Sequence, residues 1–312
     1  MKDIVSLSIN PTVDKSSTVD QVVAERKLRC TAPIFEPGGG GVNVSRAIKK
    51  LGGESTLIYT AGGLAGGMLR GLLEDEGLAP RLVPIDGMTR ESFAVLEEST
   101  GRQFRFGMPG PMLKEEEWEG ALEEFSIAAP QSGFIVASGS LPPGVPADFY
   151  ARVARAGKEA GAKVIVDTSG EPLKKALEEG VYLLKPNLRE FRELLDRDLS
   201  EEAQIEAAAR EVVASGGCEL LVISLGSAGA LFVSRDAVAH MRPPTVKIVS
   251  KVGAGDSMVA GVTLSLARGW PSRNAVLFGI ASGAAAVMTP GSELCRREDA
   301  ERLYEKLRAD QS

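Results

Sequence analysis

The segment from Val252 to Gly261 combines residue types that suit the transfer of a negatively charged group. Gly253-Ala254-Gly255 leaves the backbone free to form a tight turn, Asp256 follows, and an apolar, helix-like run begins at once. Unpaired N–H groups and the positive end of a helix would then face a developing negative charge. An aspartate at that position can accept a proton from an alcohol. The pattern indicates a phosphoryl-transfer site with its own base, and the alternative is a glycine-rich helix start with Asp256 as a charge complement.

A second glycine-rich segment, residues 37–47, contains four consecutive glycines directly before an expected helix. Such a run lets a ligand approach the backbone closely, and the alternative is a flexible loop. The segment is not a Walker A loop, because no GxxxxGK[ST] occurs in the chain, and it lacks the spacing of a dinucleotide fingerprint. Asn43, on the first helical turn, can donate and accept hydrogen bonds with a polyhydroxylated ligand.

Polar residues also follow several expected strands, at the edge where open α/β sheets bind ligands. Asp14 comes after the first strand and is placed to bind sugar hydroxyls, although an aspartate there is more often a turn residue. Asn187 and Glu190, three residues apart, would share one side of a first helical turn and suit a hydrated Mg²⁺ that holds phosphates. A helix cap closed by Glu190 is the alternative. Small-residue loops after two more strands, at 138–144 and 224–229, suit a nucleotide's phosphates or ribose.

Four basic residues lie on regions of β-like sequence. Arg90 and Arg105 are on the two arms of one expected hairpin, and Lys27 and Arg29 are on an earlier one. Guanidinium groups bind phosphate bidentately, so this cluster indicates a substrate that already carries a phosphate. Surface charge on a ribbon is the alternative.

The elements that must position these residues alternate between short apolar strands and longer helical patterns. This alternation predicts an α/β fold with a mainly parallel sheet covered on both faces. Expected strands are 4–9, 55–60, 134–138, 164–167, 182–184 and 220–224. Expected helices are 42–51, 66–76, 146–160, 171–179, 188–196, 201–215, 281–288 and 296–307.

Two regions, about 13–36 and 89–107, have strand character without helices of their own. Four extra strands would form a small sheet beside the main domain, with a hairpin turn at residues 99–101. Such a sheet cannot bury both faces by itself, so it would cover the active site, pair with another subunit, or do both. We expect one unit over residues 1–312, with this sheet as a lid.

Composition limits the classes of function. The net charge is −6, from 36 basic and 42 acidic residues, which argues against general nucleic-acid binding. The three cysteines have no metal-binding spacing, and the single histidine, His240, has no nucleophile motif near it. No apolar stretch reaches membrane-spanning length, so a cytoplasmic protein is expected.

Together these segments resemble the ribokinase-like (PfkB) family of sugar kinases. Both glycine signatures, 38–47 and 253–256, occur in order and at the expected separation. Within the family the chain is most similar to the branch that phosphorylates fructose 6-phosphate with ATP, through residues 27–33, 35–37, 139–144 and 252–259. The likeness covers about Ile4 to Cys295.

The resemblance implies a doubly wound domain with a small β lid, and a homodimer in which the lids of two subunits clasp. Asp256 would accept the proton of the sugar's 1-hydroxyl, while the N–H groups of residues 253–255 face the transferred phosphoryl group. The implied sugar-phosphate ligands are Asp14, Gly39, Asn43, Arg90, Arg105, Ser138 and Gly139, with Lys27 reaching across the dimer. The implied ATP ligands are Lys185, Asn187, Ser224, Gly226, Ser227 and Gly229, with Glu190 organising Mg²⁺ through water.

Many members of the family also hold a monovalent cation, K⁺, beside the anion hole. The matching positions here are Ser250, Val252, Ala286, Thr289, Gly291 and Glu293. The chain carries Thr289 and Glu293 where this branch commonly has asparagine and arginine. Backbone ligation of K⁺ would survive those changes.

The implied activity is the glycolytic phosphorylation of fructose 6-phosphate to fructose 1,6-bisphosphate with MgATP. Tagatose-6-phosphate kinase and 1-phosphofructokinase activities are alternatives, because these sugars differ by one stereocentre or by the phosphate position. A non-catalytic sensor of nucleotide or sugar phosphate is a further alternative, but a sensor needs no base at position 256.

Overall fold

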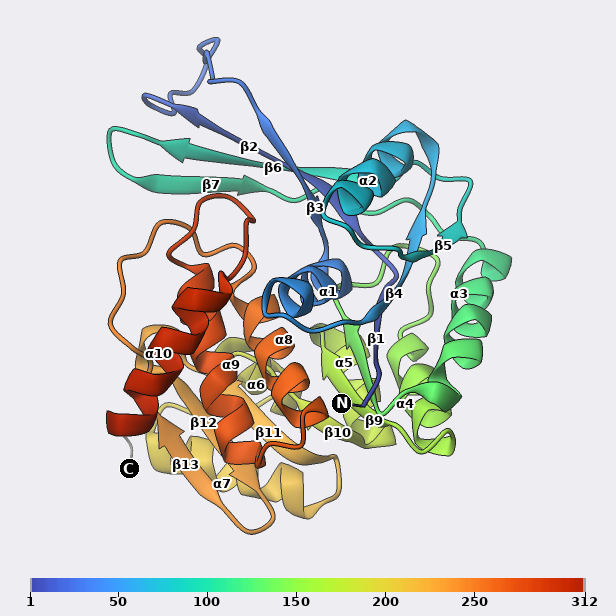
Figure 1. The fold of residues 1–312 in the computed structure, drawn as a ribbon, viewed down its shortest axis with the longest axis vertical. Coiled ribbons are helices and arrows are strands. Elements are labelled where there is room, and N and C mark those ends of the chain that lie inside the picture. The colour runs from blue at the N-terminus through green and yellow to red at the C-terminus, as the bar shows by residue number, and fades with distance from the viewer. Residues whose placement is uncertain (1, 311–312) are drawn as a thin grey trace.

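The computed structural model describes residues 2–310, and within them a nine-stranded sheet runs through the centre of the molecule (Figure 1). Its spatial order is β13 (Val238–Met241), β12 (Ala230–Ser234), β11 (Cys218–Ser224), β10 (Val181–Leu184), β9 (Lys163–Asp167), β8 (Phe134–Ser138), β1 (Ile4–Ser8), β4 (Thr56–Ala61) and β5 (Arg81–Pro84). The strands from β11 to β5 are parallel, and β12 and β13 join the β11 edge antiparallel. The predicted α/β class with a mainly parallel sheet is confirmed.

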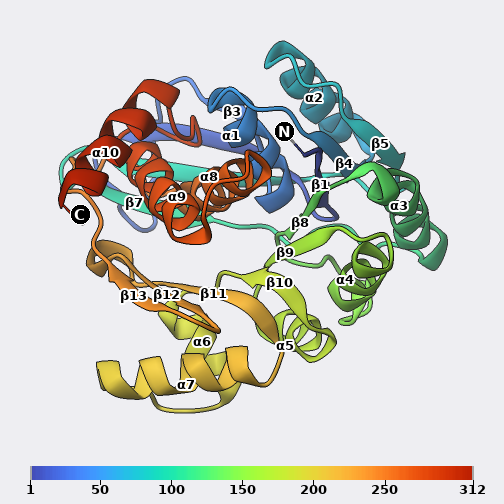
Figure 2. The ribbon, with the colours of Figure 1, turned by 60° about the horizontal axis from the view of Figure 1, so that its bottom comes forward.

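Helices cover both faces of this sheet (Figure 2), which explains why its central strands are buried on both sides. One face carries α1 (Gly40–Lys50), α8 (Ala254–Ala267), α9 (Ser272–Ala286) and α10 (Arg297–Asp310). The other carries α3 (Glu115–Ala128), α4 (Phe149–Glu159), α5 (Gly170–Glu179), α6 (Leu188–Leu195) and α7 (Glu202–Ala214). Short 3₁₀ turns occur at η1 (Ala129–Gln131) and η2 (Gly226–Ala228).

A four-stranded sheet extends beyond one end of the large sheet (Figure 1). Its order is β3 (Ile34–Gly38), β2 (Thr12–Val19), β6 (Arg90–Glu97) and β7 (Arg102–Phe106). The hairpin expected at residues 99–101 joins β6 to β7. Helix α2 (Gly63–Asp75) packs near its base, in a cluster that includes Val13 and Leu69.

Some elements differ from the sequence-based prediction. Helix α3 and strands β5 and β12 were not predicted as elements of the fold, whereas the strand-like sequence around His240 corresponds to β13. Helix α9 begins at Ser272 rather than at 281, because it is buried almost all round and so lacks the amphipathic period that marks a helix start. His240, on β13, lies 2.9 Å from Glu202 of α7, which agrees with a structural role.

No helix among residues 2–310 is both long enough and apolar enough to cross a membrane.

Candidate active site

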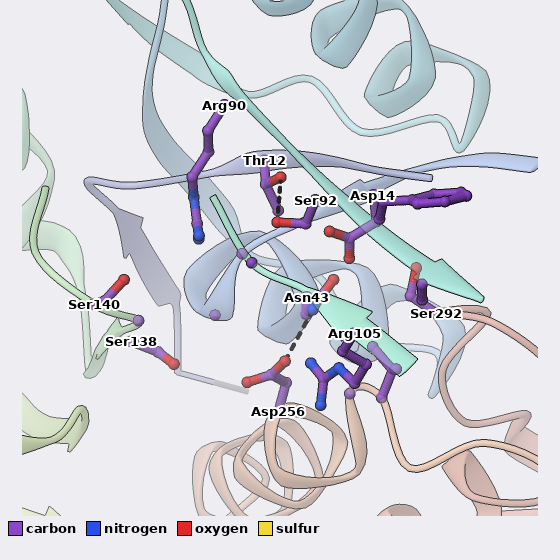
Figure 3. A pocket seen from close by; sticks show the side chains of 18 of the residues that line it. Thr12, Asp14, Asn43, Arg90, Ser92, Arg105, Ser138, Ser140, Asp256 and Ser292 are labelled. Carbon is purple, nitrogen blue, oxygen red and sulfur yellow. Dashed lines mark hydrogen bonds between the residues drawn. The ribbon is translucent and has the colours of Figure 1, made fainter. Parts of the chain in front are cut away.

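A cavity of about 540 Å³ lies between the small sheet and the carboxyl ends of the central strands (Figure 3). Most residues predicted to contact the sugar line it: Asp14, Gly39, Asn43, Arg90, Arg105, Ser138 and Gly139. Gly253 and Asp256 of the glycine-aspartate segment, together with Val252, Glu190 and Gly291, line the same cavity. Segments more than 200 residues apart in sequence therefore meet around one space, as in the contact between Asn43 and Asp256.

The first turn of α8 opens onto this cavity. Gly253 caps the helix with φ of 71°, a left-handed conformation that glycine adopts without strain. A Cβ at this position would also lie 2.2 Å from Cδ2 of Leu294, so a larger residue there would require the Leu294 side chain to move. The unpaired N–H groups of the first turn, which includes Ala254 and Gly255, give the cavity a positive end. This arrangement can bind an anion.

Asp256 stands on that first turn, and Asn43 Nδ2 of α1 donates a hydrogen bond to its Oδ2 at 2.9 Å (Figure 3). Burial by the surrounding protein raises the pKa of Asp256 to about 6, and the negative charge of Asp167 adds to this effect. The Asn43 hydrogen bond and the positive charge of Lys185 act in the opposite direction. A carboxylate with a pKa near 6 is ionised at neutral pH and still basic enough to accept a proton.

Asp14 lies on β2 across the cavity from Asp256 (Figure 3). A Cβ on Gly38 would lie 2.4 Å from its carboxyl group, so the glycine run makes room for this side chain. Burial raises the pKa of Asp14 to about 6, although the charges of Arg90 and Arg46 oppose the rise. Two carboxylates with raised pKa values thus face one polar cavity, which is typical of a functional site.

The two arginines of the small sheet differ in their contacts. Arg90 donates hydrogen bonds to the backbone oxygens of Asn10 at 2.9 Å and Met108 at 3.1 Å, which hold its guanidinium at the cavity wall. Arg105, on β7, lines the same cavity, and its positive charge acts on the carboxyl group of Asp14. Lys27 is exposed and does not line the cavity of its own chain.

Lys185 follows β10 and is buried, with its Nζ 3.2 Å from Oδ1 of Asp167. Burial alone would lower the pKa of Lys185, but Asp167, Glu190 and Asp256 raise it, so the side chain stays protonated. A Cβ on Gly255 would lie only 3.6 Å from its Nζ. The positive charge of Lys185 therefore lies beside the first turn of α8.

Asn187 and Glu190 form a capping box at the start of α6. Asn187 Oδ1 accepts a hydrogen bond from the Glu190 backbone, and Glu190 Oε2 accepts one from the Asn187 backbone. The capping interpretation from sequence is thus confirmed, and it leaves Glu190 at the cavity wall. Ser224 forms a parallel bridge with Asn187, and Gly226, Ser227 and Gly229 continue from it at the sheet edge. Lys185, Asn187 and residues 224–229 do not line the 540 Å³ cavity.

The residues that the family resemblance links to K⁺ binding form a compact loop next to the first turn of α8. Ser250 Oγ donates to the Gly291 carbonyl at 2.8 Å. The single hydroxyl hydrogen of Thr289 lies between two carbonyl oxygens, with Oγ1 2.8 Å from that of Ala286 and 2.9 Å from that of Leu294. The side chain of Glu293 pairs instead with Arg296, at 2.7 Å. The carbonyl oxygens of Ala286, Gly291 and Leu294 therefore gather at this loop, and Ser250 joins it through its side chain.

The structure adds residues that sequence reasoning missed. Further polar residues of the cavity wall are Thr12, Ser92, Asp167, Thr168, Ser169 and Ser292, and Ser140 of the predicted loop 138–144 also lines it. Asp167 is the last residue of β9, so it could have been predicted from the rule that ligands bind at the carboxyl ends of parallel strands. Ser92 and Ser292 gave no signal, because only the register of the small sheet and a tertiary contact bring them to the site.

Comparison with known proteins agrees with this geometry. A model of the pfkB family of carbohydrate kinases matches residues 1–299. The chain belongs to the PfkB family. Its members are kinases, and the ribokinase-like fold expected from the resemblance is confirmed for this PfkB kinase by the solved structures that it matches.

Several relatives with named activities are similar over nearly the whole chain. The ATP-dependent 6-phosphofructokinase isozyme 2 of Mycobacterium tuberculosis is 46% identical, covering 97% of this chain and 89% of the relative. Phosphofructokinase-2 from Escherichia coli is 42% identical, and its structures with potassium and with fructose-6-phosphate cover 99% of this chain and 100% of that chain, with TM-scores of 0.95 and 0.93. The 1-phosphofructokinase of Bacillus subtilis is 30% identical, covering 98% of each chain.

Proposed function

We propose that this PfkB kinase transfers the γ-phosphoryl group of MgATP to the 1-hydroxyl of fructose 6-phosphate, which yields fructose 1,6-bisphosphate. The observation that carries the proposal is the position of Asp256 on the first turn of α8, facing one cavity with Asp14 and Arg105. The relatives with higher identity are 6-phosphofructokinases, whereas the 1-phosphofructokinase of Bacillus subtilis is less similar.

In this proposal the chain's residues act mainly through position and charge, as phosphoryl transfer requires. Asp256 accepts the proton of the 1-hydroxyl, and the N–H groups of Gly253, Ala254 and Gly255 stabilise the charge on the transferred group. Asp14 and Asn43 bind sugar hydroxyls, and Arg90 and Arg105 bind the 6-phosphate.

ATP would bind along the carboxyl ends of β10 and β11, beside Lys185, Asn187 and residues 224–229. The donor set at Glu190 fits Mg²⁺, because a carboxylate with one oxygen used in the capping box still offers its other oxygen to a hydrated ion. Magnesium keeps several waters and needs few protein ligands, so Glu190 would hold it through water. Bound there, Mg²⁺ would neutralise phosphate charge.

We further propose that the loop formed by residues 250–252 and 286–291 binds K⁺ through backbone oxygens. Hard monovalent cations are coordinated by oxygen ligands, and carbonyls of Ala286 and Gly291 keep a second lone pair beside the hydrogen bond each accepts. The potassium complex of the Escherichia coli protein supports this proposal.

A homodimer through the small sheet is part of the same proposal. The edge strands β3 and β7 expose Ile34 at 61% and Phe106 at 48%, and exposed apolar residues on an edge strand favour association. Lys27, exposed near this sheet, would then contact the partner's site.

A coupled assay of ADP release tests the substrate directly. The panel comprises fructose 6-phosphate, tagatose 6-phosphate, fructose 1-phosphate, fructose and ribose. We expect the highest kcat/KM with fructose 6-phosphate. A higher value with another phosphosugar would move the function to a sister kinase, and no ADP release with any of them would favour the sensor.

A further inference from the structure

Arg46 is a charged side chain in the protein interior, with 1% of its surface exposed. It lies on α1, one turn after Asn43. Burying a charge is unfavourable unless it is paired and fully hydrogen-bonded. A buried arginine so close to the active site therefore needs both a set of partners and a reason for its position.

Its partners fall into two groups. Nε and one terminal nitrogen donate to the Glu76 carboxylate at 2.9 and 2.5 Å, which forms a bidentate ion pair. The other terminal nitrogen, Nη1, shares its two N–H groups among three acceptors, which are the backbone oxygens of Pro37 at 2.7 Å and Ser292 at 3.0 Å and Oδ1 of Asn43 at 3.2 Å. Glu76 balances the charge together with Glu36, whose Oε1 lies 4.0 Å from Nη2, and Nη1 faces the residues of the site.

A guanidinium group can only donate hydrogen bonds, so the atom of Asn43 that faces Arg46 must be its oxygen. The amide nitrogen of Asn43 is then on the opposite side, where it donates to Asp256 Oδ2 at 2.9 Å. We propose that Arg46 is a positioning residue for Asp256, because it fixes the orientation of the Asn43 amide that donates to this carboxylate. The inference rests on the proposed role of Asp256 as the base.

The Arg46 guanidinium also hydrogen-bonds two segments that border the cavity beside Asn43. Pro37 is in β3, directly before the glycine run, and Ser292 lines the cavity in the loop after α9. Glu36, also in β3, accepts hydrogen bonds from the backbone N–H of Ser292 at 2.8 Å and from its hydroxyl at 3.0 Å. These contacts limit how far Asn43 can move from Asp256.

Other charges also face Asp256. They are Asp167 at the end of β9, Lys185 after β10 and Asp14 on β2, while Glu190 on α6 and Arg105 on β7 line the same cavity. Burial and Asp167 raise the pKa of Asp256, whereas the Asn43 hydrogen bond lowers it. If Arg46 no longer held Oδ1, the amide could rotate and present oxygen to the carboxylate, and the pKa would rise.

The test is the pH profile of kcat with saturating fructose 6-phosphate and MgATP for the wild type, Arg46→Lys and Glu76→Gln. Lysine keeps the charge but cannot span Glu76 and Asn43 together. We expect Arg46→Lys to move the acidic limb to higher pH by about one unit, the scale of one hydrogen bond to a charged group. At pH 6, the turnover of Arg46→Lys relative to its own plateau would then be about fivefold lower than that of the wild type. Glu76→Gln is the matched control, because it alters the same buried pair without touching Asn43, and its limb should stay at the wild-type pH.

Asn43→Ala keeps Arg46 and provides an independent test if Arg46→Lys does not fold. Its acidic limb should rise as in Arg46→Lys, and the double variant should show no additional shift. The proposal would be overturned if the acidic limb of kcat stayed at the wild-type pH in Arg46→Lys or in Asn43→Ala. It would also be overturned if Glu76→Gln shifted the limb as much as Arg46→Lys does. Failure of the proposed function itself would look different, because the wild type would then release no ADP with fructose 6-phosphate and would have no profile to compare.

Discussion

The side-chain nitrogen of Asn43 lies 2.9 Å from Oδ2 of Asp256 and donates a hydrogen bond to it. This contact joins the first turns of two helices, α1 and α8, that follow the two glycine-rich segments. The residue proposed to bind the sugar thus touches the residue proposed to accept its proton. In the proposed function, this one amide group would couple sugar binding to the basicity of Asp256.

The pKa values of Asp256 and Asp14, each raised to about 6, predict the pH dependence of activity. Transfer needs ionised Asp256, so activity should be lost as the pH falls through about 6, and kcat/KM at pH 5 should be about tenfold below its plateau. Asp14→Asn removes a like charge, which lowers the pKa of Asp256 and should move the acidic limb of kcat to lower pH. A wild-type limb near the ordinary aspartate value would contradict this prediction.

Arg105→Ala should raise the KM for fructose 6-phosphate much more than the KM for ATP. A charge-assisted contact with phosphate contributes about 1.5–3 kcal/mol, so an increase of at least about tenfold is expected. Arg102→Ala is the control, since Arg102 is exposed on the same strand and does not line the cavity. Initial-rate kinetics with each substrate varied decide the point, and equal effects on both KM values would exclude a 6-phosphate contact.

Ile34→Asp should weaken the proposed dimer, because it puts a charge on an exposed apolar position of the edge strand β3. We expect the dimer Kd to rise by at least about tenfold, as measured by sedimentation equilibrium. Leu64→Asp on α2, at a position 90% exposed, is a matched control that should leave the Kd unchanged. A wild-type monomer, or an equal loss in both variants, would count against association through the small sheet.

Replacing K⁺ by a large organic cation at constant ionic strength should lower kcat if the loop beside the anion hole binds K⁺. We expect a decrease of several-fold, about 1 kcal/mol in transition-state energy, because the loop adjoins the first turn of α8. Measuring kcat at a series of K⁺ concentrations, with Na⁺ as the comparison ion, gives the affinity. A kcat that is independent of K⁺ would contradict the proposal.

Much of the framework could be predicted from sequence, because buried parallel strands and capped helices leave clear local patterns. Strand β8 was predicted at its observed bounds, Phe134–Ser138, and the hairpin at residues 99–101 was also found. Helix α9 was predicted too short, since a helix buried on all sides has no polar face to mark its start.

The site was predictable where glycine or a strand end marked it, and not where tertiary packing alone created it. Asp256, Asn43 and Asp14 stand out beside such signals. Arg46 appears as an ordinary helical arginine in the sequence, and its interior position depends on Glu76, thirty residues away. Ser292 reaches the cavity only through its contacts with Glu36 and Arg46.

The most direct test of the account is the turnover of Asp256→Asn with fructose 6-phosphate and MgATP, beside ATP binding measured by calorimetry. The asparagine keeps the size of the side chain but cannot accept the proton, so we expect kcat to fall by roughly two to four orders of magnitude. The affinity for ATP should stay close to that of the wild type. A variant that binds ATP and turns over at a near-normal rate would contradict the assignment of Asp256 as the base.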